Sequence, residues 1–196
     1  MVIDRTKYMT VDEVKQLCAF TEGWCLRDLR DGRITGVNTW MVVDLALATG
    51  LRVSELAAIQ LKDIDLKRGF IKVHRLKRKK KVIDALAISP ELIKHLKEYI
   101  EWADLTTGAL FIGKRGPMTP YALQHIWRRA VKEAGLPKEL SIHSARHTMA
   151  VHLLKKTGNL RQVQKQLGHA SPATTANMYA DISFEDMQNG VTGLYQ

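Results

Sequence analysis

The chain has 196 residues, 45% of them hydrophobic and 26% charged, which is long enough to bury one core. It has only two cysteines, which excludes a disulfide framework and a four-cysteine zinc site, and it lacks an apolar stretch like those of signal peptides and membrane spans. We therefore expect a soluble, cytoplasmic protein without a membrane partner.

Positive charge is concentrated in the later part of the sequence. The net charge is +10; residues 1–60 hold 7 Lys and Arg against 8 Asp and Glu, whereas residues 61–196 hold 23 against 12. A one-sided excess of positive charge is typical of proteins that bind nucleic acid. Charge alone leaves open the alternative that these side chains only keep the surface soluble.

The first third predicts two helices. Thr10 and Glu13 have the spacing of a capping box, so a helix begins there. Residues 27–36 are rich in charge, Gly and Asp and are predicted to be a loop. An apolar run of helical length follows over residues 37–48, and Gly50 suits the left-handed end of that helix.

Arg52 follows that helix end, in the turn before the next helix. A guanidinium in such a turn can bind an anion together with backbone amides. The alternative is a surface arginine paired with Glu55 three residues later. The sequence around Arg52 does not decide between them.

A basic hairpin is predicted from residue 64 onward. Residues 70–73 and 82–88 have β-forming character, and nine basic residues but no acidic one lie from Lys67 to Lys81. Like charges crowded on a turn cost stability but suit a phosphate backbone, where they release counterions. The hairpin residues that we expect to contact DNA are Arg75, Arg78, Lys79, Lys80 and Lys81.

Two helices with clear start signals come next. Ser89 and Pro90 open one that extends through Trp102, and Thr119 and Pro120 open another to about Ala134. The second has a polar, basic face that includes Arg128 and Arg129, which we also expect to contact DNA. An ordinary amphipathic surface helix remains the alternative.

The last third predicts three short helices: one from Ser141 to Gly158, one over residues 160–167 closed by Gly168, and one that begins at Ser171 and carries Tyr179. No repeat or second core is evident. The expected fold is therefore α+β: a single, mostly α-helical domain with a small antiparallel β-sheet.

The side chains of this last third suit chemistry at a phosphodiester. His143 and Arg146 lie three residues apart on one helical face, so both could reach one phosphate. His143 and His147 do not form a zinc helix of the HExxH type, because Ser144 stands where that motif has Glu. Two arginines can stabilise the charge of the transition state without a metal, while a phenol needs a base to become a nucleophile.

The sequence resembles the tyrosine recombinase, or phage integrase, family from Met9 to about Asp181. The resemblance is carried by segments in the order of the family: Ala48–Leu56 (ATGLRVSEL), the basic hairpin, His143–Thr148 (HSARHT), Leu167–His169 (LGH) and Thr174–Thr175 before Tyr179. It implies the catalytic-domain fold of that family and an enzyme that cuts and rejoins DNA at specific sites.

The resemblance also implies roles for individual residues. Arg52 and Arg146 would bind the scissile phosphate, and Tyr179 would attack it to leave a 3′-phosphotyrosine and a 5′ hydroxyl. His143 would act as general base and acid, and His169 would donate a hydrogen bond to the phosphate.

Two further roles are implied by the resemblance. Glu55 would orient its neighbours, and Lys77 would protonate the leaving oxygen, with Lys79 as its rival. No metal, ATP or other cofactor is expected, since the phosphotyrosine keeps the energy of the broken bond.

The implied partners are double-stranded DNA recombination sites, held by a tetramer on synapsed DNA and a monomer when free. We expect residues 1–196 to be a single DNA breaking and rejoining domain without the N-terminal core-binding domain of most members; a fragment of a longer integrase is the alternative. Tyr179 lies ten residues after His169, one more than usual in the family, and Tyr195 is the next tyrosine. A type IB topoisomerase and a non-catalytic DNA-binding regulator remain alternative functions.

Overall fold

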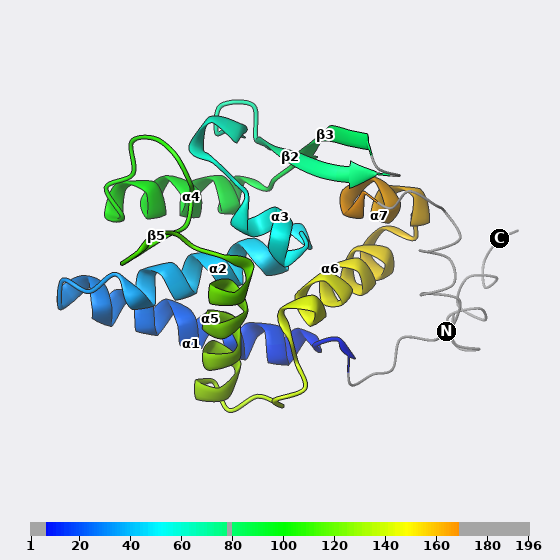
Figure 1. The fold of residues 1–196 in the computed structure, drawn as a ribbon. Helices are drawn as coiled ribbons and strands as arrows, with labels where there is room; N and C mark the ends of the chain where they lie inside the picture. Colours follow the sequence, from blue (N-terminus) through cyan, green and yellow to red (C-terminus); the bar gives the residue numbers. More distant parts are fainter. Residues whose placement is uncertain (1–6, 78–79, 169–196) are drawn as a thin grey trace, which may run out of the picture.

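The described part of the protein is mostly helical, with a small sheet along one side (Figure 1). This structure, a computed structural model, describes residues 7–77 and 80–168; for residues 76, 77, 80 and 81 it describes the backbone alone. The elements in chain order are α1 Val11–Arg30, α2 Thr35–Thr49, α3 Val53–Ala57, the 3-10 turn η2 Leu61–Asp63, β1 Ile64–Asp65, β2 Phe70–Lys77, β3 Lys80–Ala87, α4 Pro90–Trp102, β4 Ile112–Gly113, β5 Gly116–Pro117, α5 Pro120–Glu133, α6 Ile142–Thr157 and α7 Leu160–Leu167.

The capping box at the start of α1 is confirmed, but the loop predicted after this helix is wrong in length. The Thr10 hydroxyl accepts a hydrogen bond from the Glu13 amide at 3.1 Å, and the Glu13 carboxylate accepts one from the Thr10 amide at 2.6 Å. The helix continues to Arg30, because arginines in the last turn of a helix interact favourably with its dipole. The buried carboxylate of Asp28 then accepts a hydrogen bond from the Gly36 amide at 2.7 Å and holds a shorter turn.

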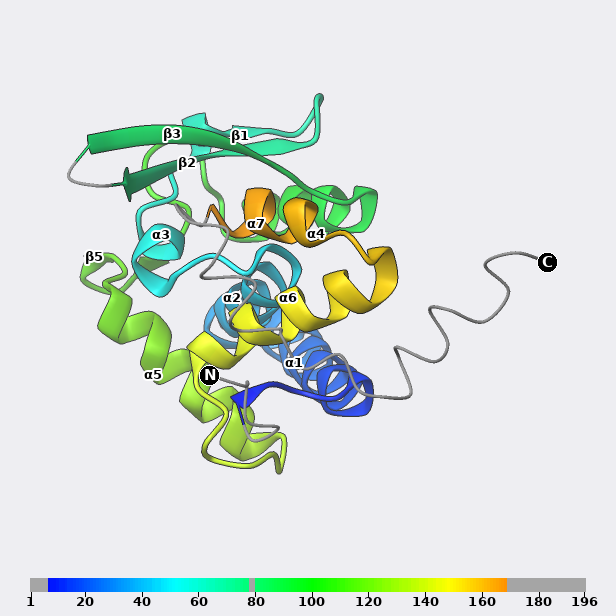
Figure 2. The same cartoon turned by 90° about the vertical axis from the view of Figure 1, so that its right-hand side faces the viewer.

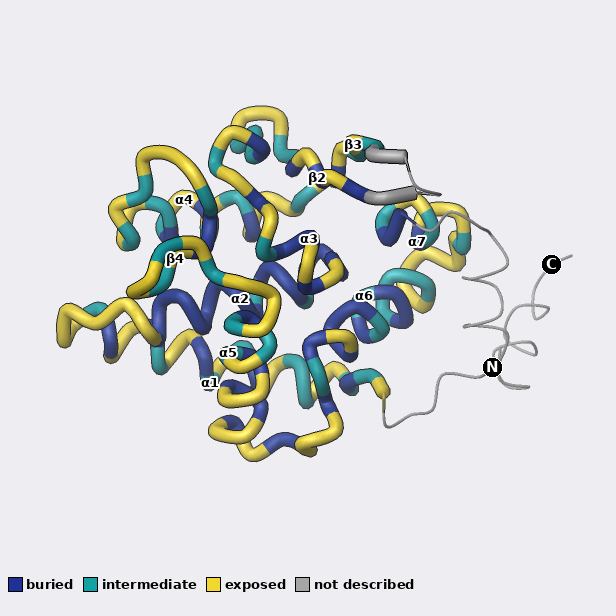
Figure 3. The backbone as a smooth tube through the Cα atoms, in the orientation of Figure 1, coloured by how far each residue is buried: buried dark blue, intermediate teal, exposed yellow. Residues whose placement is uncertain are grey.

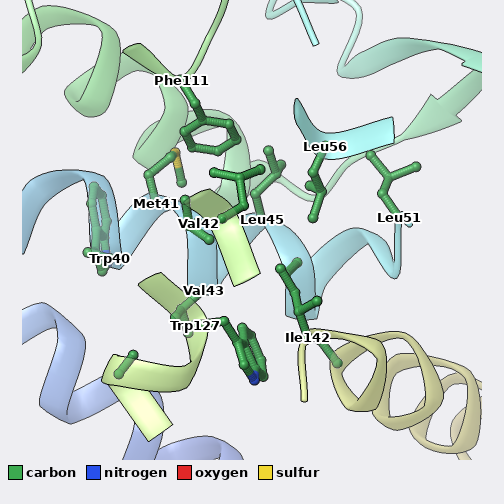
Figure 4. Close-up of a cluster of buried hydrophobic side chains, with 14 of the residues drawn as sticks. Trp40, Met41, Val42, Val43, Leu45, Leu51, Leu56, Phe111, Trp127 and Ile142 are labelled. Carbon is green, nitrogen blue, oxygen red and sulfur yellow. The ribbon is translucent and has the colours of Figure 1, made fainter. Parts of the chain in front are cut away.

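Helix α2 is the centre of the core. It is buried on nearly all sides (Figure 3), with α1, α4, α5 and α6 packed around it. The close-up in Figure 4 shows its side chains facing Phe111, Trp127 of α5 and Ile142 at the start of α6. The predicted end of α2 is confirmed, since Gly50 has a φ of 63°. The chain therefore leaves this rigid helix directly before Arg52.

The predicted hairpin is confirmed, with longer strands than expected. Strands β2 and β3 are antiparallel and stay paired from Phe70 with Ala87 to Lys77 with Lys80, so only residues 78 and 79 lie between them. Strand β1 pairs with the other edge of β2. Helix α7 lies beneath this hairpin and α6 beneath α7 in both views (Figures 1 and 2). Residues distant in sequence thus meet under the sheet.

The other predicted helix ends within the described residues are confirmed to within a residue, and the helix predicted from Ser171 lies outside them. Ser89 and Thr119 cap α4 and α5 through their hydroxyls, and α6 and α7 end at Gly158 and Gly168 with φ of 61° and 65°. Across residues 7–77 and 80–168, no helix is long and apolar enough to span a bilayer.

Replacing Tyr99 with phenylalanine is expected to lower the free energy of unfolding by about 1–3 kcal/mol, since buried acceptors would lose their donor. The fully buried Tyr99 hydroxyl donates to Asn38 Oδ1 at 2.6 Å and lies 3.2 Å from the Leu110 carbonyl oxygen. Urea unfolding measures the change. The matched control is Tyr121→Phe, whose ring is 72% exposed and whose loss of a hydroxyl should change little.

Candidate functional site

The first part of the site is the turn that carries Arg52. Arg52 is the N-cap of α3, and Glu55 in the first turn of that helix binds it twice. Glu55 Oε2 accepts a hydrogen bond from the Arg52 amide at 2.8 Å, and Oε1 accepts one from Nη1 at 3.0 Å. The Glu55 side chain is 7% exposed and that of Arg52 is 46% exposed. A buried carboxylate therefore orients a guanidinium that solvent can reach.

Arg146 of α6 joins this turn to the end of α7. Its side chain is buried; Nη1 donates to the Gly50 carbonyl at 2.8 Å and Nη2 to the Leu167 carbonyl at 2.9 Å. Gly50 lies two residues before Arg52, so the Arg146 guanidinium lies beside the turn that carries Arg52. His143, one turn before Arg146, is exposed at the start of the same helix.

His147 lies in the same electropositive surroundings. Its ring is partly buried, and its Nδ1 makes no hydrogen bond with any residue that the structure describes. Burial lowers the pKa of His147, and the positive charges of Arg146, His143 and Lys7 lower it further. These surroundings therefore favour the neutral form of His147, one turn after His143 on α6. Burial likewise lowers the pKa of His152, opposed by a hydrogen bond with the Met9 backbone.

These two histidines predict acid sensitivity. A histidine whose pKa is lower in the folded than in the unfolded protein binds fewer protons when folded, so stability falls as the pH drops below the ordinary value of 6.5. We expect the free energy of unfolding to be smaller at pH 5.5 than at pH 7.5, and the difference to shrink in His147→Gln. Urea titrations at both pH values measure this. His125→Gln, on the exposed face of α5, is the control that should keep the full difference.

Arg75 does not lie where the hairpin prediction put it. Its side chain is only 2% exposed, so the prediction that it contacts DNA from the hairpin surface disagrees with the structure. Side chains alternate between the faces of a strand, and in β2 Ile71, Val73 and Arg75 are buried while Lys72 and His74 are exposed. This alternation was visible in the sequence, but the burial of an arginine was not.

The buried guanidinium of Arg75 faces three elements. Nη2 donates to the Gln166 carbonyl of α7 at 3.1 Å, Nε lies 3.8 Å from Glu55 Oε1, and Nη1 lies 3.5 Å from Asp84 Oδ2 of β3. Sequence reasoning missed Asp84 and Gln166. The signal for Asp84 was that it is the only acidic residue between Asp65 and Glu91.

The other residues predicted to contact DNA differ in their surroundings, and several are not described by the structure. Arg128 is exposed on α5, whereas the guanidinium carbon of Arg129 lies 4.7 Å from the ring centroid of Trp24, a cation–π contact with α1. Arg78, Lys79, His169, Tyr179 and Tyr195 lie outside the described residues, as do the side chains of Lys77, Lys80 and Lys81. Among residues whose side chains are described, no three His, Cys, Asp or Glu are grouped to hold a metal ion.

The chain is similar to known proteins over most of its length. Residues 7–186 match the phage integrase family. The tyrosine recombinase XerD of Staphylococcus saprophyticus is 35% identical over 161 residues, which are 77% of this chain and 52% of that protein. The tyrosine recombinase XerC of Lactobacillus delbrueckii subsp. bulgaricus is 32% identical over 173 residues, 84% of this chain and 57% of that protein. The chain thus spans about half the length of the curated relatives it matches.

Solved structures share the fold. The crystal structure of XerA recombinase superposes with a TM-score of 0.75 at 27% identity, over 93% of this chain and 61% of that one. The Tn1549 transposon integrase, in complex with transposon right end DNA, gives a TM-score of 0.75 at 23% identity over 93% and 64% of the two chains. The mostly helical fold with a small antiparallel sheet is therefore confirmed.

Proposed function

This chain belongs to the phage integrase family, and from that premise we propose that it is the DNA breaking and rejoining domain of a site-specific recombinase. The observation that carries the proposal is the bond from Arg146 Nη1 to the Gly50 carbonyl, which brings Arg146 beside the turn of Arg52. Two guanidiniums at one place can hold the two non-bridging oxygens of a phosphate and stabilise their charge as the bond breaks.

The reaction that we propose is transesterification without ATP. The Tyr179 oxygen attacks the phosphorus, the bond to the 5′ oxygen breaks, and a 3′-phosphotyrosine forms. His143, exposed at the start of α6, takes the phenol proton, and His169 donates a hydrogen bond to the phosphate. Lys77, with Lys79 as its rival, returns a proton to the 5′ oxygen. A 5′ hydroxyl then reverses the step and joins a new strand.

The partner that we propose is double-stranded DNA, in the cytoplasm. The net charge of +10 and the nine basic residues from Lys67 to Lys81 favour phosphate contacts that weaken as salt rises. A tetramer would hold two recombination sites, and the free protein would be a monomer. Arg128 stays exposed and available to such contacts.

A nicked suicide duplex tests the proposal. Inverted repeats in the DNA that flanks the gene supply the sequence, and a nick close to the cleavage point lets the short product diffuse away, which traps the adduct. We expect a covalent complex at the 3′ phosphate that resists SDS. Absence of any adduct, with binding retained, would instead indicate a non-catalytic DNA-binding regulator. Rapid relaxation of a supercoiled plasmid that lacks these repeats would instead indicate a type IB topoisomerase.

A further inference from the structure

We propose that Arg75 is a positioning residue, one that fixes the end of α7 and the Glu55–Arg52 pair relative to each other and does not bind DNA. The proposal rests on the proposed function, because it assigns Arg75 to the same reaction. Arg75 is not a catalytic residue, since it would act on the reacting groups only through Glu55 and α7.

Two buried arginines cap consecutive carbonyls at the end of α7. Arg75 Nη2 donates to the Gln166 carbonyl at 3.1 Å, and Arg146 Nη2 donates to the Leu167 carbonyl at 2.9 Å. The last carbonyls of a helix have no partner within it, and a cation there also interacts favourably with the helix dipole. The chain continues from this turn through Gly168 to His169. The two guanidiniums therefore fix the end of α7, which lies two residues before His169 in the sequence.

One carboxylate connects Arg75 to Arg52. Glu55 Oε1 lies 3.0 Å from Arg52 Nη1 and 3.8 Å from Arg75 Nε. Arg52 caps the start of α3, whereas Arg75 lies in β2, so the carboxylate connects the two elements. The Glu55 side chain is 7% exposed, so little water screens this carboxylate from either guanidinium. Without Arg75, Glu55 would be held by Arg52 alone, and the orientation of both would loosen.

Burial argues against a purely stabilising role for Arg75. Its Nε and Nη1 make no hydrogen bond within the part of the chain whose side chains are described, and the two carboxylates lie at ion-pair rather than hydrogen-bond distances. Burial lowers the pKa of Arg75, opposed by Glu55 and Asp84. A buried ion pair contributes little net stability, because the cost of removing both charges from water offsets their attraction. A buried arginine that is incompletely hydrogen-bonded is therefore more readily explained by geometry than by stability.

Packing at Gly168 points the same way. Gly168 has a φ of 65°, and a methyl group on its Cα would overlap the guanidinium of Arg75. The end of α7 and the guanidinium of Arg75 are thus in direct contact. No nitrogen of a side chain that is 2% exposed can reach DNA without a rearrangement of the hairpin.

The test compares Arg75→Met with wild type on the suicide duplex. At saturating DNA we expect the single-turnover rate of adduct formation to fall by about a hundredfold, as for other small misplacements of reacting groups. The dissociation constant and its salt dependence should stay unchanged, whereas loss of a phosphate contact would reduce the salt slope by about one. The midpoint of urea unfolding should fall, because Glu55 and the Gln166 carbonyl lose a buried partner, so the rate is measured under conditions in which urea curves show the variant folded. Arg30→Met makes the same chemical change at an exposed residue in the last turn of α1; it is the matched control and should keep the wild-type rate.

Each other outcome overturns the inference. A wild-type rate in Arg75→Met would overturn it, with or without a reduced salt slope. It would also be overturned if the loss of rate were no larger than the fraction of the variant that is unfolded. Should Arg75→Met fail to fold, Arg75→Lys decides the question: it keeps the charge but not the planar fork, and a folded Arg75→Lys must still lose rate without losing affinity. Failure of the wild-type protein to form any adduct would instead contradict the proposed function.

Discussion

Replacing Arg146 with lysine is expected to slow formation of the covalent adduct by about a hundredfold to a thousandfold, the usual loss when one donor to the transition state is removed. Arg146 spans the Gly50 and Leu167 carbonyls, at 2.8 and 2.9 Å, through two nitrogens of one planar group. A lysine ammonium is a single point and cannot span both. Arg146 joins the end of α2 to the end of α7, and these two helix ends would then separate at the place where we propose that the phosphate binds. Single-turnover kinetics on the suicide duplex at saturating DNA measures the rate.

The matched control for Arg146→Lys is Arg30→Lys, which makes the same chemical change at an exposed residue in the last turn of α1. It should cleave at the wild-type rate. Because Arg146 is buried, its replacement should also lower the free energy of unfolding by about 1–3 kcal/mol, so urea curves must establish that the variant is folded in the assay. If a folded Arg146→Lys forms the adduct at a rate within a few-fold of wild type, Arg146 stabilises the structure but does not act in the reaction.

Helix ends were predictable from the sequence because their determinants are local. Thr10, Ser89 and Thr119 each satisfy an amide within the next three residues, and Gly50 and Gly168 adopt the left-handed conformation that other residues avoid. A short stretch of sequence contains all the atoms involved. The end of α1 was missed because a run of charged residues is typical of a loop, whereas the carboxylate of Asp28 is buried and accepts hydrogen bonds from the Gly36 amide and the Arg33 side chain.

The sequence predicted which residues belong to the site better than it predicted how their side chains are oriented and buried. The spacing of His143 and Arg146 placed them on one helix turn, as found, but the bond from Arg146 to Gly50 spans 96 residues and depends on how α6 packs on α2. Arg75 was grouped with the basic residues around it because of its charge, although the alternation along the strand places it on the face of Ile71 and Val73. Its burial depends on Glu55, Asp84 and Gln166, which three other elements supply.

Replacing Tyr179 with phenylalanine is expected to abolish the covalent adduct while leaving DNA affinity almost unchanged. The phenol oxygen is the atom that we propose becomes bonded to phosphorus, and phenylalanine has no atom to replace it. A free phenol has a pKa of about 10, so attack near neutral pH requires that a base such as His143 take the proton. A neutral side chain contributes little to a binding free energy that phosphate contacts dominate. SDS gels of the suicide duplex measure the adduct, and gel shifts at fixed salt measure the affinity.

Tyr195→Phe is the control for Tyr179→Phe, because Tyr195 is the other tyrosine that follows His169. It should form the adduct at the wild-type rate. The reverse result, with adduct in Tyr179→Phe and none in Tyr195→Phe, would make Tyr195 the nucleophile and would mean that the ten-residue spacing from His169 is not that of the reacting tyrosine. Adduct in both variants would require a different nucleophile, and peptide mapping of the trapped complex would then identify it.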